Sequence, residues 1–192
     1  MTQNTPHKQL SETDALALAS RTDTVELAAE ARALCDSAHG NIITYSKKVF
    51  IPLTHLCRDV CHYCTFARTP KRIDQPYLPV EQVLELCHQG AAEGCQEALF
   101  TLGEKPELRY KAARDALAEL GFESTIDYVI EVAGRVLKET GLIPHINAGN
   151  MTAEEVNRLR QVSASMGIML ESISSRLCEK GMPHYGSPDK DP

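Results

Sequence analysis

Three cysteines within one short run are the residues of this chain whose types and spacing point most directly to chemistry. Cys57, Cys61 and Cys64 are separated by three and then by two residues. Three thiolates at this spacing can hold three corners of a cubic iron–sulfur cluster and leave the fourth iron without a protein ligand. A purely electron-carrying cluster would need a fourth cysteine nearby, and the next one is Cys87. The run therefore predicts a cluster whose open iron is available for chemistry.

Two other interpretations of the same run stay open. A structural zinc site needs four ligands, and His55 or His62 would supply the fourth, although such sites usually have a second ligand pair farther along the chain. The pair Cys61 and Cys64 alone resembles a two-cysteine redox motif, but this interpretation leaves Cys57 unexplained. We prefer the cluster because it accounts for all three cysteines.

Composition argues against several other classes of protein. The 192 residues are 43% hydrophobic and 24% charged, which is typical of a globular chain with a buried core. The net charge of -6, without a dense basic patch, argues against nucleic acid as a partner. No apolar run approaches the roughly 18 residues that span a membrane. Seven cysteines form no even disulfide framework, so we expect a cytoplasmic protein with reduced thiols and no membrane partner.

The chain is expected to begin with a helical leader over residues 1–41. Ser11 and Asp14 have the spacing of a capping box, and a second helical stretch ends at Gly40. From residue 49 onward, short apolar runs typical of strands alternate with stretches whose apolar residues recur at helical spacing. The expected strands are 49–53, 97–102, 142–147 and 167–171, and the main expected helices are 80–90, 106–120, 124–140 and one that starts at Thr152.

Alternating strands and helices predict an α/β fold with a parallel sheet, whose chemistry gathers at the carboxyl ends of the strands. An eight-stranded (β/α) barrel needs about 250 residues, so we expect a partial barrel containing its first four strands only. Residues 42–192 would then be the N-terminal part of a core domain that is truncated before the barrel is complete. Polar candidates follow the strands at the expected edge: Gly103 and Glu104, Asn147 and Asn150, and Glu171 and Ser172.

The cysteine run, with Tyr63 before its last cysteine, resembles the signature of the radical S-adenosylmethionine (SAM) superfamily. Within that superfamily the chain resembles the FO synthase family, in its cyclising, deazaflavin-forming domain or subunit. The segments that carry this resemblance are 43–54, 64–66, 103–107, 144–150 and 169–172. They imply a partial radical SAM barrel.

The resemblance implies a 4Fe-4S cluster held by Cys57, Cys61 and Cys64, with SAM bound to the open iron. One electron from an electron donor protein would split SAM and give a 5'-deoxyadenosyl radical. This radical would take hydrogen from an adduct of tyrosine and 5-amino-6-(D-ribitylamino)uracil, a small-molecule substrate. Ring closure with loss of ammonia would give 7,8-didemethyl-8-hydroxy-5-deazariboflavin (FO), the chromophore of coenzyme F(420). The adduct would come from a sister tyrosine-adding radical SAM activity, on the same or another chain.

The resemblance also implies roles for the other candidates. Tyr63 would pack near the adenine of SAM, and Gly103 with Glu104 would meet its methionine ammonium. Partners for the ribose or the substrate are expected among Asn147, Asn150, Glu171 and Ser172. Ordinary local roles stay open for each of them: core packing, a solvated carboxylate or a loop cap. The alternatives for the whole chain are the sister enzyme, another radical SAM enzyme and, more remotely, a zinc-binding module.

Overall fold

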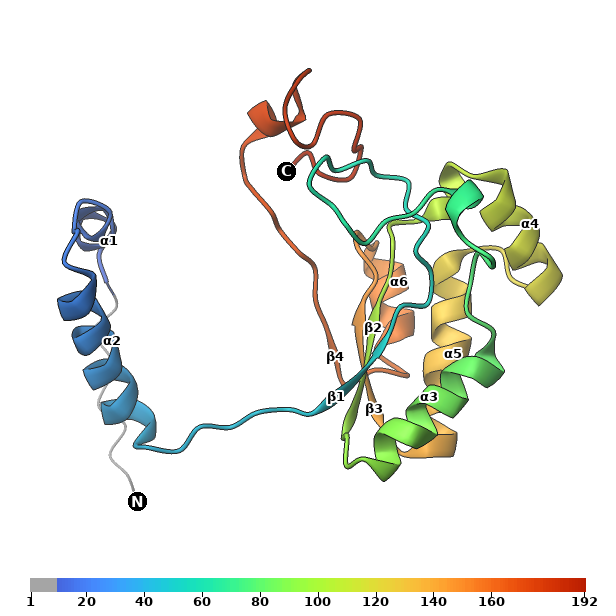
Figure 1. Cartoon of the computed structure of the whole chain (residues 1–192), viewed down its shortest axis with the longest axis horizontal. Helices are drawn as coiled ribbons and strands as arrows, with labels where there is room; N and C mark the ends of the chain where they lie inside the picture. Colours follow the sequence, from blue (N-terminus) through green and yellow to red (C-terminus); the bar gives the residue numbers. More distant parts are fainter. Residues whose placement is uncertain (1–9) are drawn as a thin grey trace. The chain divides into compact units, whose positions relative to one another are not determined.

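A computed structural model describes residues 10–192, and these divide into two units at Tyr45 and Ser46. The first unit contains α1 (Glu12–Leu18) and α2 (Thr24–His39), shown in blue in Figure 1. Ser11 and Asp14 form the predicted capping box, and α2 ends at Gly40, so both predicted helix signals are confirmed. The predicted leader 1–41 begins within residues 1–9, which lie outside the described residues.

The second unit contains a parallel four-stranded sheet in the order β1-β2-β3-β4. Its strands are β1 (Lys48–Ile51), β2 (Glu97–Thr101), β3 (Ile143–Asn147) and β4 (Ser165–Met166). Its α-helices are α3 (Val80–Ala92), α4 (Lys111–Leu120), α5 (Thr125–Thr140) and α6 (Ala153–Leu159). The alternation of strands and helices and the parallel pairing confirm the predicted α/β class with four strands.

Helices α3 and α5 pack side by side against one face of the sheet (Figure 1). Side chains alternate across a strand, so Phe100 of β2 and Ile146 of β3 point to these helices and are fully buried. Helix α5 contributes the fully buried Val129 and Val132 to the same core. The opposite face of β2 and β3 is less buried and carries polar side chains together with Leu99 and Ile143. The helices therefore fix the sheet from one side and leave its strand ends free for a site.

The predicted helix 106–120 is wrong in its first part. Pro106–Leu108 form a 3-10 turn, Tyr110 is extended, and α4 begins only at Lys111. The break turns Glu107 inward, where its carboxylate accepts hydrogen bonds from the backbone N–H of Thr125 at 3.1 Å and its hydroxyl at 2.6 Å. Glu107 thus caps the start of α5, a long-range contact that helical periodicity does not report.

The predicted fourth strand 167–171 is also wrong in position. Strand β4 is only Ser165–Met166, and residues 167–171 leave the sheet. The pairing of β3 with β4 stops at Ile146 and Met166, although β3 itself continues to Asn147. Gly167 still donates its N–H to the carbonyl of Ile146 at 3.0 Å. The apolar run after it is exposed instead of paired.

None of the helices within residues 10–192 has the length and apolar character needed to cross a membrane.

Candidate functional site

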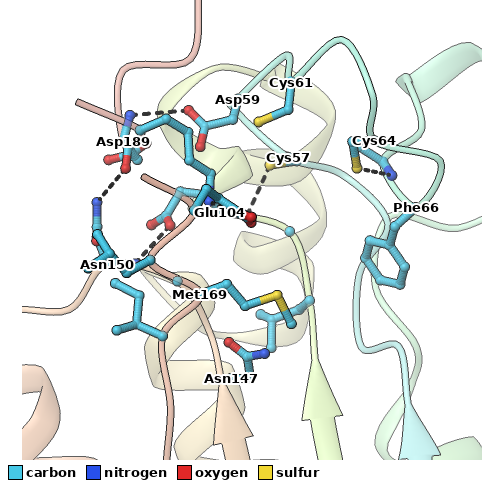
Figure 2. Close-up of a pocket in the computed structure, with 18 of the residues that line it drawn as sticks. Cys57, Asp59, Cys61, Cys64, Phe66, Glu104, Asn147, Asn150, Met169 and Asp189 are labelled. Atoms are coloured by element: carbon cyan, nitrogen blue, oxygen red, sulfur yellow. Dashed lines mark hydrogen bonds and ion pairs between the residues drawn. The ribbon is translucent and has the colours of Figure 1, made fainter. Parts of the chain in front are cut away.

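A cavity of about 410 Å³ lies beyond the carboxyl ends of the strands (Figure 2). This volume is within the usual range for small-molecule sites. All residues that the sequence nominated line this one cavity: Cys57, Cys61, Tyr63, Cys64, Gly103, Glu104, Asn147, Asn150, Glu171 and Ser172. Parallel pairing explains the gathering, because it brings the ends of β1, β2 and β3 to the same edge.

The cysteine loop follows β1 and is held at its base by buried backbone contacts. Thr54 donates its hydroxyl to the carbonyl of Pro76 at 2.7 Å and accepts from the N–H of Leu56 at 3.0 Å. The residue after β2 that faces this loop is Gly103, where a Cβ atom would lie 1.9 Å from the carbonyl oxygen of Leu56. Gly103 is therefore needed for the close approach of two backbones, and this approach brings the loop beside β2.

The three sulfur atoms lie along one side of the cavity (Figure 2). Each of them has a hydrogen-bond contact. The N–H of Glu104 donates to Cys57 Sγ at 3.2 Å, and the N–H of Ala67 donates to Cys64 Sγ at 3.4 Å. Ser187 Oγ lies 3.5 Å from Cys61 Sγ. Burial raises the pKa of the Cys57 thiol to about 11, so without metal it stays protonated. Sulfur ligands with nearby donors are the environment that iron–sulfur clusters have in proteins.

Both histidines considered as a fourth zinc ligand are engaged elsewhere. His55 Nδ1 is 3.0 Å from the carbonyl of Phe66, and its ring packs on that phenyl ring with centroids 4.4 Å apart. His62 Nε2 is 3.3 Å from the carbonyl of Tyr185. Neither histidine is among the residues that line the cavity, which favours a site with three sulfur ligands over a tetrahedral zinc site completed by either imidazole.

A buried acidic group lies next to the cysteines and consists of Asp59, Glu104 and Asp189. One carboxylate oxygen from each lies within 4.8 Å of the others. Glu104 Oε2 accepts from the N–H of Asn150 at 2.8 Å, whereas Glu104 Oε1 and Asp59 Oδ2 are buried with no partner among the described residues. Burial, reinforced by Asp189 and Asp59, raises the pKa of Glu104 to about 7, and burial also raises the pKa of Asp59. Such a group is arranged to receive a cationic part of a ligand.

The C-terminal segment 183–190 packs on the cysteine loop. Asp189 forms a two-point ion pair with Arg58, with Nη2 to Oδ1 at 2.6 Å, and its carbonyl accepts from Asn150 Nδ2 at 3.0 Å. The N–H of His62 donates to the carbonyl of Pro183 at 2.9 Å. The prolines of this tail are typical of a loop. The segment is irregular, but it supplies part of the cavity wall.

Sequence reasoning missed Asp59 and Asp189 as site residues. Asp59 lies inside the cysteine run, but the interpretation of this run rested on the spacing of its cysteines. Asp189 belongs to a short charged stretch among prolines, which resembles a solvated tail. Neither position carries a signal of burial, because the contact between them joins residues 130 apart: the N–H of Asp189 donates to Asp59 Oδ1 at 3.2 Å.

The other nominated residues differ in how free their side chains are. The hydroxyl of Tyr63 is 3.0 Å from His184 Nε2, and its ring is half exposed. Asn150 and Ser172 have local partners, the carbonyl of Asp189 and the N–H of Ser174. The carboxylate of Glu171 lies 3.8 Å from Lys190. Their positions on the cavity wall are compatible with contacts to a ligand and also with purely structural roles, such as core packing or capping a loop.

The match to known families decides what kind of site this is. The sequence model of the radical SAM superfamily matches residues 51–187, most of the chain and all of the cavity's cysteine wall. The chain belongs to the radical SAM superfamily. The cofactors of a radical SAM protein are a 4Fe-4S cluster and SAM. Three cysteine thiols on the cavity wall, beside a buried acidic group, fit both of them.

Curated relatives of this radical SAM chain carry names from deazaflavin synthesis. FO synthase of Mycobacterium leprae (strain TN) is 56% identical over 155 residues, 78% of this chain and 18% of the relative. The 7,8-didemethyl-8-hydroxy-5-deazariboflavin synthase of Methanopyrus kandleri is 47% identical over 151 residues, 79% of this chain and 45% of the relative. The chain thus spans less than half the length of these relatives.

Solved structures of radical SAM proteins share the fold. Methylornithine synthase matches 94% of this chain and 50% of its own with a TM-score of 0.67 at 22% identity. The FeFe-hydrogenase maturase HydG from Carboxydothermus hydrogenoformans matches 96% of this chain and 40% of its own with a TM-score of 0.71 at 21% identity. At this identity the likeness supports the barrel-type fold alone.

The buried carboxyl of Glu104 predicts a pH dependence of stability. Its pKa is raised from 4.5 to about 7, so between these pH values the folded chain keeps a proton that the unfolded chain releases. Glu104 therefore destabilises the fold increasingly as the pH rises through this window. In the metal-free protein, Glu104→Gln should raise the free energy of unfolding by at most about 3 kcal/mol at neutral pH and hardly at all below about pH 4.5.

Urea unfolding at pH 4.5 and pH 7.5 measures this difference, with Glu119→Gln on the exposed surface as the matched control. A gain of equal size at both pH values, or a loss at neutral pH, would contradict the assignment of Glu104 as a strained buried acid.

Proposed function

We propose that this chain is the N-terminal part of the radical SAM core of an FO synthase, in its cyclising, deazaflavin-forming domain or subunit. The observation that carries the proposal is the identity of 47–56% to proteins named for this synthesis, over nearly four-fifths of the chain. The cavity supports it, because the same stretch of chain gathers three thiols and two buried carboxyl oxygens that have no partner within the part of the chain that the structure describes. Residues 1–41 are proposed as a helical leader and 42–192 as the core, which is compatible with the division at Tyr45 and Ser46.

Cys57, Cys61 and Cys64 are the proposed ligands of the cluster. When bound, the cluster and SAM supply the 5'-deoxyadenosyl radical, while the chain orients them and limits the access of water. The donors at 3.2–3.5 Å from the three sulfurs compensate the negative charge of the thiolates. The backbone contact at Gly103 keeps the loop in place during this chemistry.

Glu104 and Asp59 are the proposed partners of the methionine ammonium of SAM. Both carboxyls are more than nine-tenths buried, and each has one oxygen without a partner among residues 10–192. An ammonium placed between these oxygens would make charge-assisted hydrogen bonds and relieve the repulsion between the two acids. Tyr63 is proposed to pack near the adenine from the cysteine side of the cavity.

The proposed substrate is the adduct of tyrosine and 5-amino-6-(D-ribitylamino)uracil. Hydrogen abstraction from it, ring closure and release of ammonia give FO in this proposal. Polar contacts to the ribose or the substrate are proposed for four residues of the cavity wall: Asn147, Asn150, Glu171 and Ser172. A sister tyrosine-adding activity in cis or in trans would supply the adduct, and an electron donor protein would supply the electron. All seven cysteines are free, which suits a reducing, cytoplasmic setting.

The cluster itself is tested by anaerobic reconstitution. The protein should take up about four irons per chain and show broad visible absorption, because three cysteines can hold a cubic cluster. Cys61→Ala should abolish this uptake, whereas Cys87→Ala, a buried cysteine of α3, should retain it. Stoichiometric zinc without iron would overturn the proposal and return the site to the zinc interpretation.

The role of Glu104 is tested by the affinity for SAM. Glu104→Gln loses one charged partner, which costs about 1.5 to 3 kcal/mol, so binding should weaken roughly 10- to 150-fold with the cluster intact. Anaerobic calorimetry of the reconstituted protein measures the dissociation constant. The same substitution is expected to stabilise the metal-free fold at neutral pH, so weaker binding would not reflect unfolding. Unchanged affinity would place the ammonium elsewhere.

The activity is tested in the full polypeptide that carries this chain. It is supplied anaerobically with tyrosine, 5-amino-6-(D-ribitylamino)uracil, SAM, a strong reductant and the sister activity, and the fluorescent deazaflavin is measured. Product is expected with the intact cysteine run and not with Cys61→Ala. Radical cleavage of SAM without any deazaflavin, although adduct is present, would reject FO synthesis and keep only the superfamily.

A further inference from the structure

The three cysteines differ in whether a backbone group or a side chain contacts their sulfur atom. Cys57 and Cys64 receive backbone N–H groups, from Glu104 and Ala67. Cys61 is instead contacted by the side chain of Ser187, which follows it by 126 residues. A backbone donor is present whatever residue occupies its position. The contact to Cys61 alone depends on the type of a side chain, so a substitution can remove it.

Chemistry fixes which atom donates in this contact once metal is bound. A thiolate that ligates iron has no proton, so Cys61 Sγ can only accept. Ser187 Oγ already accepts from the N–H of Val60 at 3.0 Å, and its own proton remains to be donated. The sulfur at 3.5 Å is within hydrogen-bond reach of that hydroxyl. Ser187 therefore bridges the backbone and the sulfur atom of the same loop.

The hydroxyl is held in this position by the tail around it. Ser187 is 4% exposed, and its N–H donates to the carbonyl of His184 at 2.9 Å. The preceding Gly186 has φ of +82°, and a Cβ atom there would lie 3.0 Å from Val60 Cγ2, so glycine permits the tail to approach the loop. Asp189, two residues after Ser187, forms an ion pair with Arg58 of the cysteine loop (Figure 2 shows Asp189 beside the loop).

We propose that Ser187 is a positioning residue whose hydroxyl donates to Cys61 and raises the reduction potential of the cluster. The inference rests on the proposed function, because it takes Cys61 as a ligand. One electron from an external low-potential donor reduces the cluster from its 2+ to its 1+ state, with no proton transferred. The added negative charge is spread partly onto the sulfurs, so a donor stabilises the reduced state more than the oxidised state. Removing the donor makes reduction harder.

The test is a redox titration of the reconstituted protein, followed by electron paramagnetic resonance. At a fixed potential near the wild-type midpoint, Ser187→Ala should lower the ratio of reduced to oxidised cluster by about tenfold, which equals about 59 mV for a one-electron couple. Iron content should stay the same. Ser187→Thr keeps a hydroxyl and should titrate close to wild type. Ser175→Ala, at an exposed serine that precedes this segment, is the matched control and should not shift the potential.

Two further variants separate the hydrogen bond from a general loosening of the loop. His62→Ala removes a contact between loop and tail that does not involve sulfur, the one to the carbonyl of Tyr185. It should leave the potential unchanged. If Ser187→Ala assembles no cluster, the isosteric pair Ser187→Thr and Ser187→Val isolates the hydroxyl, and only the valine variant should be shifted.

The outcomes distinguish this inference from the proposed function. An unshifted potential in Ser187→Ala or Ser187→Val with about four irons bound would overturn the inference and leave the cluster assignment standing. An equal shift in His62→Ala would attribute the effect to loop packing and overturn it as well. Failure of the wild-type protein to bind iron would instead reject the proposed function.

Discussion

The backbone contact between the cysteine loop and the residues after β2 is the constraint on which the site depends. Gly103 lies against the carbonyl of Leu56, and its N–H donates to the carbonyl of Thr54 at 3.2 Å. One residue later, the N–H of Glu104 donates to Cys57 Sγ, and its carbonyl accepts from the N–H of Arg58 at 2.8 Å. A single short stretch after β2 thus places both a sulfur atom and a buried carboxyl.

This arrangement has an electrostatic cost that points to a ligand. Two buried carboxyl oxygens that have no partner among residues 10–192, and a Glu104 pKa raised to about 7, are unfavourable for the fold. A fold tolerates such groups where a bound cation compensates them, and perturbed acids accordingly gather at functional sites. Stability and binding therefore oppose each other at Glu104. The same carboxyl that weakens the metal-free fold at neutral pH is the one proposed to hold the ammonium of SAM.

The C-terminal segment shows how a stretch without regular structure contributes to the site. Its contacts with the cysteine loop include an ion pair, backbone hydrogen bonds and the hydroxyl of Ser187. Because these contacts all involve the cysteine loop, the segment restricts the movement of the loop, as the sheet does at the loop's base. Order in this tail therefore comes from its contacts with the loop together with its own turn hydrogen bonds.

The sequence by itself predicted the superfamily and the class of fold. Cysteine spacing predicted the ligand set, capping signals located α1 and α6, and alternating patterns predicted a parallel sheet with Glu104 and Asn147 at one edge. These features are local, since each depends on residues a few positions apart. The ligand roles of the cysteines and the other nominated residues stay predictions.

Tertiary structure alone decided the rest. It broke the predicted helix at Tyr110 so that Glu107 caps α5, and it ended the pairing of β3 with β4 at Ile146 and Met166. It also joined Asp189 to Asp59 and Ser187 to Cys61. Each of these contacts links residues far apart in the chain. The burial that they create changes the pKa of the acidic side chains and determines which hydrogen bonds the site residues form. A pattern of neighbouring residues contains no information about such contacts, because they exist only once the sheet and the tail have come together.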